Sequence, residues 1–347
     1  MSLIFGINLS DRIYLSADTR LTIEKSDGTK EYRDNTIKII PFPSPIAVAV
    51  AGKTRAARFI LQKLLENEKS VDLSIRTLRE NILNRITPIV DELLTSGFKY
   101  DQLKVCLLFA GLNKNAKKKV AGGKKLIELV GECQNLEKKS EEGLITKLLD
   151  KSFRGNHALL ANALANSQQN LKDVHFQALM KQKVDDKGMV TADITDSHIF
   201  AILINPPDPP IIEDAEWGEF LAFGPRITKN QIPKNAFCKL EFKSNGKINI
   251  DHALLTAIIE TTAREYNLDT VGGSIFSVVI SEKGGGALTG EVNSINMDTG
   301  EKAKLSKITS DGNGIFYSET PRGERQKLIP FTELDEAEFT TGADLML

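Results

Sequence analysis

Short apolar runs alternate with polar turns over the first part of the chain, which is typical of a sheet. Residues 2–7 and 13–17 are two such runs, and the polar residues between them predict a tight turn. The polar stretch 21–35 predicts a hairpin loop. Two more strands are predicted at 36–40 and 46–51, and the second is continuously apolar, as in a strand buried on both faces. The chain is therefore expected to begin within a sheet.

The next apolar positions change to a helical period. Residues 53–67 and 72–95 repeat apolar side chains every three to four positions, so each predicts a helix. Asp72 is the expected N-cap of the second helix, and Pro88 is expected to kink it. A strand at 104–110 follows.

Residues 114–196 break this pattern and predict an insertion of mostly helical structure, with 157–165 as one helical stretch. The insertion opens with a lysine-rich run. A solvated face is the expected role of such a run, and contact with an anionic partner is the alternative.

Strands resume at 199–204 and 219–223, followed by a helix at 250–266 and a buried strand at 274–280. The remaining residues, 283–347, have few strand signals and form a C-terminal extension whose role the sequence does not indicate.

Strands and helices that occur in groups predict an α+β fold of two packed sheets with helices outside. The expected core is 1–113 together with 197–282, the insertion being 114–196 and the extension 283–347.

Composition and charge exclude several function classes. Lysine plus arginine (45) nearly balances aspartate plus glutamate (46), so neither a nucleic-acid nor a membrane partner is expected. The 3 cysteines and 4 histidines lack metal-ligand spacing, so no metal or cofactor is expected. The first residues do not resemble a secretory signal, and the expected location is the cytoplasm.

Four residues suggest a chemistry that begins at the N-terminus. Ser2 follows Met1, and after removal of Met1 its hydroxyl and its α-amino group would belong to one residue. The amine, with a pKa of about 8, can then act as the base that activates the hydroxyl. Asp18 ends the second strand and Lys38 lies in the third, where a lysine must be paired or functional. Gly52 precedes a helix N-terminus, where free N–H groups can stabilise an oxyanion.

The spacing of these residues resembles that of proteasome β-type subunits and their bacterial relatives, which are N-terminal-nucleophile (Ntn) hydrolases. The matching positions are Ser2 with Gly6, Asp18 with Arg20, Lys38-Ile39 and Ala51-Gly52. Asp18 lies sixteen residues after Ser2, and Gly52 lies fourteen residues after Lys38, as the family pattern requires. The resemblance covers roughly 2–112 and 198–280.

The later part of the family pattern matches partially. Asp269, Gly272 and Gly273 resemble its D-x-x-S-G motif, with glycine at 272 in place of serine. Pro225, after Gly224, similarly replaces the serine of a G-S-G turn. A cap of the preceding helix is the alternative role for Asp269.

The resemblance implies a four-layer αββα Ntn-hydrolase sandwich and an amide hydrolase. Ser2, Asp18, Lys38, Gly52 and Asp269 would be catalytic, and Asp18 would pair with Lys38. The supporting residues would be Arg20, Gly272 and Gly273. It further implies peptide or unfolded-protein substrates, a homo-oligomer such as a ring, and an ATPase partner. The two missing serines favour an inactive scaffold or regulatory subunit as the alternative, and a small-molecule amidase is a third, weaker one.

Overall fold

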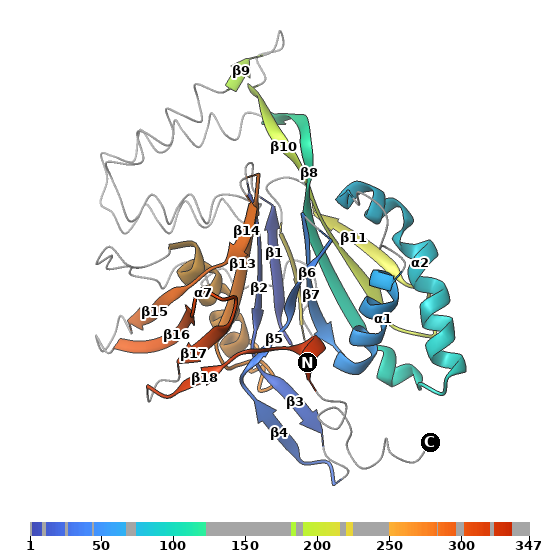
Figure 1. Ribbon diagram of the computed structural model, residues 1–347, viewed down its shortest axis with the longest axis vertical. Coiled ribbons are helices and arrows are strands. Elements are labelled where there is room, and N and C mark those ends of the chain that lie inside the picture. The colour runs from blue at the N-terminus through green and yellow to red at the C-terminus, as the bar shows by residue number, and fades with distance from the viewer. Residues whose placement is uncertain are drawn as a thin grey trace.

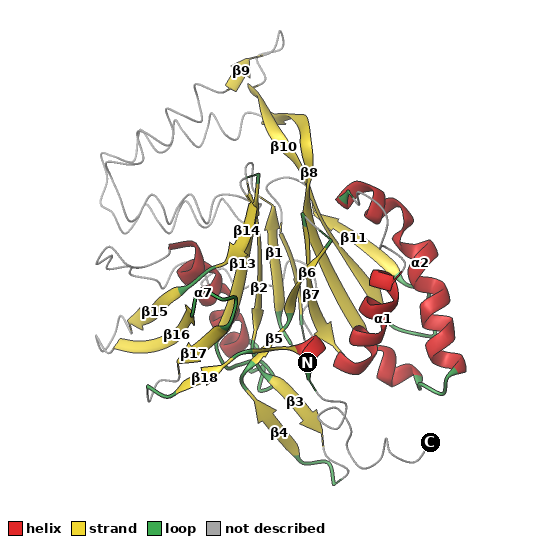
Figure 2. Cartoon of the chain, in the orientation of Figure 1, coloured by secondary structure: helices red, strands yellow, loops and turns green. Residues whose placement is uncertain are grey.

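The structure is a computed structural model, and most of the part that it describes is sheet, with a few helices (Figures 1 and 2). The described residues are 2–8, 12–24, 27–43, 45–66, 74–122, 182–184, 190–215, 220–224, 250–282, 284–295, 302–319 and 323–334.

The first half of the chain contains the five expected strands, of which 36–40 is divided into β5 and β6, and two further strands within the expected hairpin loop. The strands through β7 are β1 Ile4–Asn8, β2 Arg12–Asp18, β3 Leu21–Glu24, β4 Lys30–Arg33, β5 Thr36–Ile37, β6 Ile39–Phe42 and β7 Ile46–Gly52. The next elements are α1 Thr54–Glu66, α2 Ile75–Thr95, the short 3-10 helix η1 Tyr100–Leu103 and β8 Val105–Gly122.

The second half adds strands to both sheets and ends in a small sheet of its own. Its elements are β9 Gln182–Val184, β10 Val190–Ile204, β11 Ile211–Ala215, β12 Phe220–Phe223, α7 Ile250–Glu265, β13 Ile275–Ser281, β14 Gly284–Ala287, β15 Gly290–Ile295, β16 Lys302–Ser310, β17 Phe316–Glu319, β18 Arg325–Lys327, β19 Ile329–Pro330 and η3 Phe331–Glu333.

Two antiparallel sheets form the centre of the molecule. One has five strands in the order β12-β1-β2-β13-β14. The other has six, in the order β11-β10-β8-β7-β6 with β9 paired to β10. In the first sheet Ile4 lies opposite Ala17, so the start of β1 lies beside the end of β2. In the second sheet Ile39 lies opposite Ala49, so the start of β6 lies beside the end of β7. The residues predicted for the site lie at or next to these strand ends.

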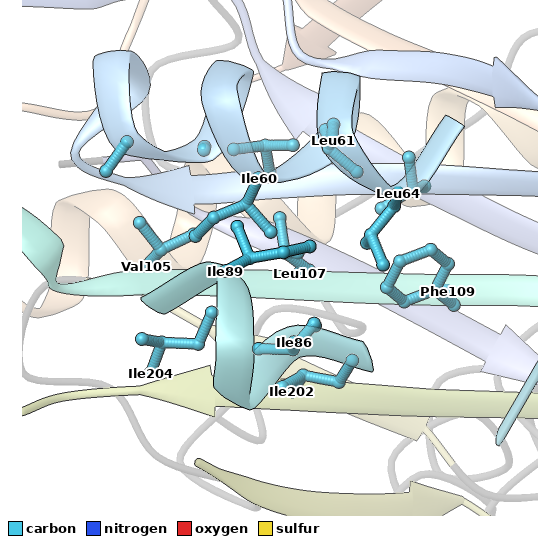
Figure 3. Close-up of a cluster of buried hydrophobic side chains, with 14 of the residues drawn as sticks. Ile60, Leu61, Leu64, Ile86, Ile89, Val105, Leu107, Phe109, Ile202 and Ile204 are labelled. Carbon is cyan, nitrogen blue, oxygen red and sulfur yellow. The ribbon is translucent and has the colours of Figure 1, made fainter. Parts of the chain in front are cut away.

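Three apolar clusters hold the elements together. The first packs α1 and α2 on the outer face of the six-stranded sheet through residues such as Ile60, Ile86 and Phe109 (Figure 3). The second lies between the two sheets, and the third packs α7 on the outer face of the five-stranded sheet. Alternation along β2 explains this arrangement, because Leu15 faces the inter-sheet cluster and Tyr14 faces α7.

The start of α2 differs from the prediction. Ser74, and not Asp72, caps the helix, and its Oγ accepts a hydrogen bond from the Thr77 N–H at 3.1 Å. Pro88 lies inside the helix, which continues to Thr95. Among the described helices, none has the length and apolarity that a membrane crossing needs.

Both boundaries between the expected core and the expected insertion lie inside strands. The expected insertion begins within β8, which continues to Gly122, and it ends within β10. The predicted helical stretch 157–165 lies outside the described residues. The extension expected to be poor in strands contains β14 to β19, because its strands are short and largely polar and therefore give a weak apolar signal.

Candidate functional site

The carboxylate of Asp18 is the centre of a buried polar cluster at the end of β2. Asp18 is fully buried, and its Oδ1 accepts a hydrogen bond from the Leu3 N–H at 2.9 Å. Its Oδ2 accepts bonds from the backbone N–H of Arg20 at 3.2 Å and of Gly272 at 3.4 Å. Backbone donors from three separate segments therefore compensate a buried negative charge.

Lys38 supplies the cation of this cluster. It lies between β5 and β6, and its Nζ donates to Asp18 Oδ2 at 3.0 Å and to the carbonyl oxygen of Arg20. Burial lowers the pKa of Lys38, and the charge and hydrogen bond of Asp18 oppose that shift. The predicted pairing of Asp18 with Lys38 is confirmed, and the ammonium can lose its proton more readily than an exposed lysine.

Ser2 is linked to this pair through the residue that follows it. Ser2 is buried, and the N–H of its peptide bond to Leu3 is the group that donates to Asp18 Oδ1. The backbone of Gly224 lies close to that of Ser2, since a Cβ added at Gly224 would lie 3.4 Å from the Ser2 carbonyl oxygen. Pro225 lies outside the described residues.

Gly52 occupies a position that other residues cannot adopt without strain. Its φ is +102°, and an added Cβ would lie 2.2 Å from the carbonyl oxygen of Lys104. Two residues earlier, the Val50 N–H donates to the Lys38 carbonyl oxygen at 3.0 Å. Gly52 is thus the last residue of β7, the strand that binds the Lys38 carbonyl, and only Lys53 separates it from the start of α1.

Arg20 fills the space that a serine at position 272 would need. Its guanidinium binds both carboxylate oxygens of Asp34, at 2.7 and 2.9 Å, and this hydrogen bonding raises the pKa of Arg20. A Cβ added at Gly272 would lie only 2.6 Å from Arg20 Cζ. The glycine in place of the expected serine therefore has a steric reason. Asp34 belongs to the site and was not predicted, since no motif singles it out.

Gly273 lets the chain approach Thr19. Its φ is +74°, and an added Cβ would lie 2.5 Å from Thr19 Oγ1. The next residue, Ser274, donates its N–H to that oxygen at 2.8 Å and accepts from the Thr19 N–H at 2.9 Å. Gly272 and Gly273 therefore shape the backbone that supports Asp18.

The structure does not bring the carboxylate of Asp269 to Asp18 and Lys38. The side chain is 67% exposed and contacts Lys30 and Tyr32 of β4, each at 3.5 Å. Only its carbonyl oxygen reaches the cluster, where it accepts from Arg20 Nη1 at 3.1 Å. The Asp269 side chain thus attaches the β3–β4 hairpin to the site, because its nearest cation is on that hairpin.

Glu260 of α7 is a second titratable residue that sequence reasoning missed. It is half-buried, and its charge interacts with those of Asp18, Arg20 and Arg264. Burial raises the pKa of Glu260 to about 7, with a smaller contribution from the negative charge of Asp18. A helical position within an apolar stretch gave no sequence signal for this behaviour.

We expect Glu260→Gln to change the pH dependence of stability. The folded state keeps a proton on Glu260 that the unfolded state releases near pH 4.5, so unfolding free energy should fall as pH rises from about 4.5 to about 7. The glutamine variant should lack this fall and be more stable at pH 8, by up to about 3 kcal/mol. Urea unfolding at pH 5 and pH 8 measures the difference. As a control, Glu80→Gln, on an exposed position of α2, should show the same pH dependence as the parent. The prediction would be contradicted if the unfolding free energy of the parent and of Glu260→Gln changed equally between pH 5 and pH 8.

Comparison with known proteins gives distant structural similarity alone. No protein-family model matches the chain, and no curated protein matches it. Among solved structures it is similar to an Anbu (Gly-1) mutant from Hyphomicrobium sp. strain MC1, with 10% identity, 90% of each chain covered and a TM-score of 0.44. It is also similar to Anbu, named as an ancestral beta-subunit, from Yersinia bercovieri (10% identity, 82% of this chain and 86% of that chain, TM-score 0.41). A third is the helical assembly of the Anbu complex from Pseudomonas aeruginosa, with 9% identity, 82% of this chain and 86% of that chain covered, and a TM-score of 0.43.

Proposed function

We propose that this chain is an N-terminal-nucleophile amide hydrolase whose nucleophile is Ser2 after removal of Met1. The observation that carries the proposal is the buried Asp18 carboxylate, which binds both the N–H that follows Ser2 and the ammonium of Lys38. The arrangement of two packed sheets with α1 and α2 on one outer face and α7 on the other supports it as well, and we propose that this arrangement is the αββα sandwich of the family.

In the proposed reaction, Ser2 Oγ attacks the carbonyl carbon of an amide while the α-amino group accepts the hydroxyl proton, through a water molecule. Asp18 holds Lys38 in place, and in this proposal the positive charge of Lys38 lowers the pKa of the amine or hydroxyl. The Gly52 N–H stabilises the oxyanion. The amine product leaves with the proton, and water then hydrolyses the ester on Ser2.

Arg20, Gly272 and Gly273 have supporting roles in this proposal. The carbonyl oxygen of Arg20 accepts a hydrogen bond from Lys38. The guanidinium of Arg20 occupies the space in which a side chain at position 272 would begin. Removal of the two family serines is therefore compatible with an active site that uses other contacts. For Asp269 we propose attachment of the hairpin, without a direct part in the reaction.

We propose peptides or unfolded proteins as the substrates, in a homo-oligomeric assembly such as a ring that an ATPase serves.

A hydroxyl-reactive electrophile tests the function directly. We expect a peptide β-lactone to form one covalent adduct, and peptide mapping should locate it on Ser2. Intact mass before treatment should show that Met1 is absent, because the mechanism needs a free amine on Ser2. A protein with a free Ser2 amine that forms no adduct with any of a panel of β-lactones and epoxyketones would instead indicate a non-catalytic scaffold.

A further inference from the structure

The last described segment of the chain returns to the candidate site. After β18, the Leu328 N–H donates to the Phe316 carbonyl at 2.8 Å, and the chain then leaves the C-terminal sheet. β19 pairs in parallel with β5, with Ile329 opposite Thr36, and the Ile329 N–H donates to the Asn35 carbonyl at 2.8 Å. Lys38 is the residue that directly follows β5. In Figure 1 this segment is the red chain that runs from β18 past β5 toward α1.

The end of the segment is held against α1. Phe331 is fully buried and Leu334 nearly so, and both belong to the apolar cluster of α1 and α2. Arg58 of α1 donates from Nη1 to the Leu334 carbonyl oxygen at 2.6 Å. The pairing with β5 covers only two residues, so buried side chains and one guanidinium hold most of the segment in place.

These contacts resemble those by which proteins bind peptides at a sheet edge, with two strand residues followed by the 3-10 turn of η3. Peptide recognition at a sheet combines main-chain hydrogen bonds along a strand with pockets for some of the side chains. A buried aromatic anchor then supplies most of the affinity, and a charge-assisted bond to a carbonyl fixes the end of the peptide. Residues 329–334 show all three features within a single short stretch.

We propose that the surface formed by Asn35 to Ile37 and Arg58, here called the docking surface, is a peptide-binding site that Ile329–Leu334 occupies in cis. Its ligand class is a peptide that pairs with β5 over two residues and then forms a 3-10 turn, with bulky apolar residues three positions apart, as Phe331 and Leu334 are. A peptide in trans must displace this segment. Its apparent dissociation constant is therefore the intrinsic constant divided by the fraction of molecules in which the surface is free.

This site would deepen the proposed function, on which its role in substrate binding rests, because a peptide on β5 lies next to Lys38. Binding itself requires no chemistry from Ser2. The inference can therefore be tested in a protein that cannot react.

The test uses the full chain carrying Ser2→Ala and a fluorescent peptide with the sequence of residues 327–334. We expect Phe331→Ala to bind the peptide at least about tenfold more tightly than the parent, measured by fluorescence anisotropy, because the cis segment is weakened and the docking surface is unchanged. A peptide with alanine at the Phe331 position should bind weakly to both proteins.

Two substitutions on α1 serve as a matched pair. Adding Arg58→Ala to Phe331→Ala should weaken peptide binding, because the carbonyl loses its donor. Arg55→Ala should not, since the Arg55 guanidinium lies over the Phe98 ring, 5.2 Å from its centroid.

If Phe331→Ala does not unfold cooperatively, Leu334→Ala is measured by the same criterion. A folded variant that binds the peptide no better than the parent would overturn the proposal and leave the segment as core packing. Because Ser2 is absent throughout, a failure of the hydrolase proposal would not alter this result.

Discussion

Replacement of Ser2 by alanine should abolish amide hydrolysis, with kcat/KM falling by at least about a thousandfold. The reason is chemical, since the variant keeps the N-terminal amine and loses the only atom that forms the acyl-enzyme. The measurement is turnover of the fluorogenic peptide amide that the parent cleaves fastest. The fold should persist, because Ser2 forms no part of the three apolar clusters.

Ser2→Thr is the matched control for this substitution. It retains a hydroxyl and an amine on one residue, so it should keep measurable turnover and react with the β-lactone. Equal turnover in Ser2→Ala and the parent would show that the nucleophile is elsewhere. Loss of turnover in both variants, with normal unfolding, would show that the site tolerates no extra methyl group.

The parts of the fold that sequence predicted well are those with strong apolar periodicity. The buried strand 46–51 and the helices at 53–67 and 250–266 correspond to β7, α1 and α7 within a few residues. The hairpin β3–β4 and the strand β11 were missed because their residues are polar or adjacent to prolines. β-propensity depends on partners that a local pattern does not contain, so such strands become visible only when their neighbours are known.

The site shows a similar division. The family resemblance predicted that Asp18 and Lys38 would pair, and the structure confirms this pairing. It could not reveal Asp34 or Glu260, since these act through contacts between distant segments. The carboxylate of Asp269 fitted a family pattern, but its contacts are with Lys30 and Tyr32 of the β3–β4 hairpin. The catalytic roles themselves remain predictions.

Separation of Asp18 from Lys38 should produce the largest loss of stability. Lys38→Met leaves a fully buried carboxylate without its cation, which typically costs about 3–5 kcal/mol of unfolding free energy. Three backbone N–H groups still bind that carboxylate, so the cost should lie near the lower end. Asp18→Asn should cost more, because one amide oxygen replaces two carboxylate oxygens facing four donors, and its NH₂ then faces other N–H groups.

The double variant separates the ion pair from the rest of the cluster. Asp18→Asn with Lys38→Met should be less destabilised than the sum of the single variants, by about 0.5–3 kcal/mol, because no unpaired charge remains. Urea unfolding at pH 7 measures all four proteins. Lys63→Met, which breaks an exposed pair with Glu92 at 2.9 Å, should leave stability unchanged within error.

The pH dependence of these variants gives an independent check on Lys38. Burial lowers its pKa, so the unfolded state binds more protons than the folded state over the range up to about 10.5. Through that range the contribution of Lys38 to stability becomes more favourable as pH rises, and the trend should be stronger in Asp18→Asn, where no anion opposes the shift. Lys38→Met should lack the trend. Additive single variants with parallel pH profiles would mean that Asp18 and Lys38 do not depend on each other. The three backbone donors alone would then hold the carboxylate, and the proposal that Asp18 positions Lys38 for the reaction would lose its support.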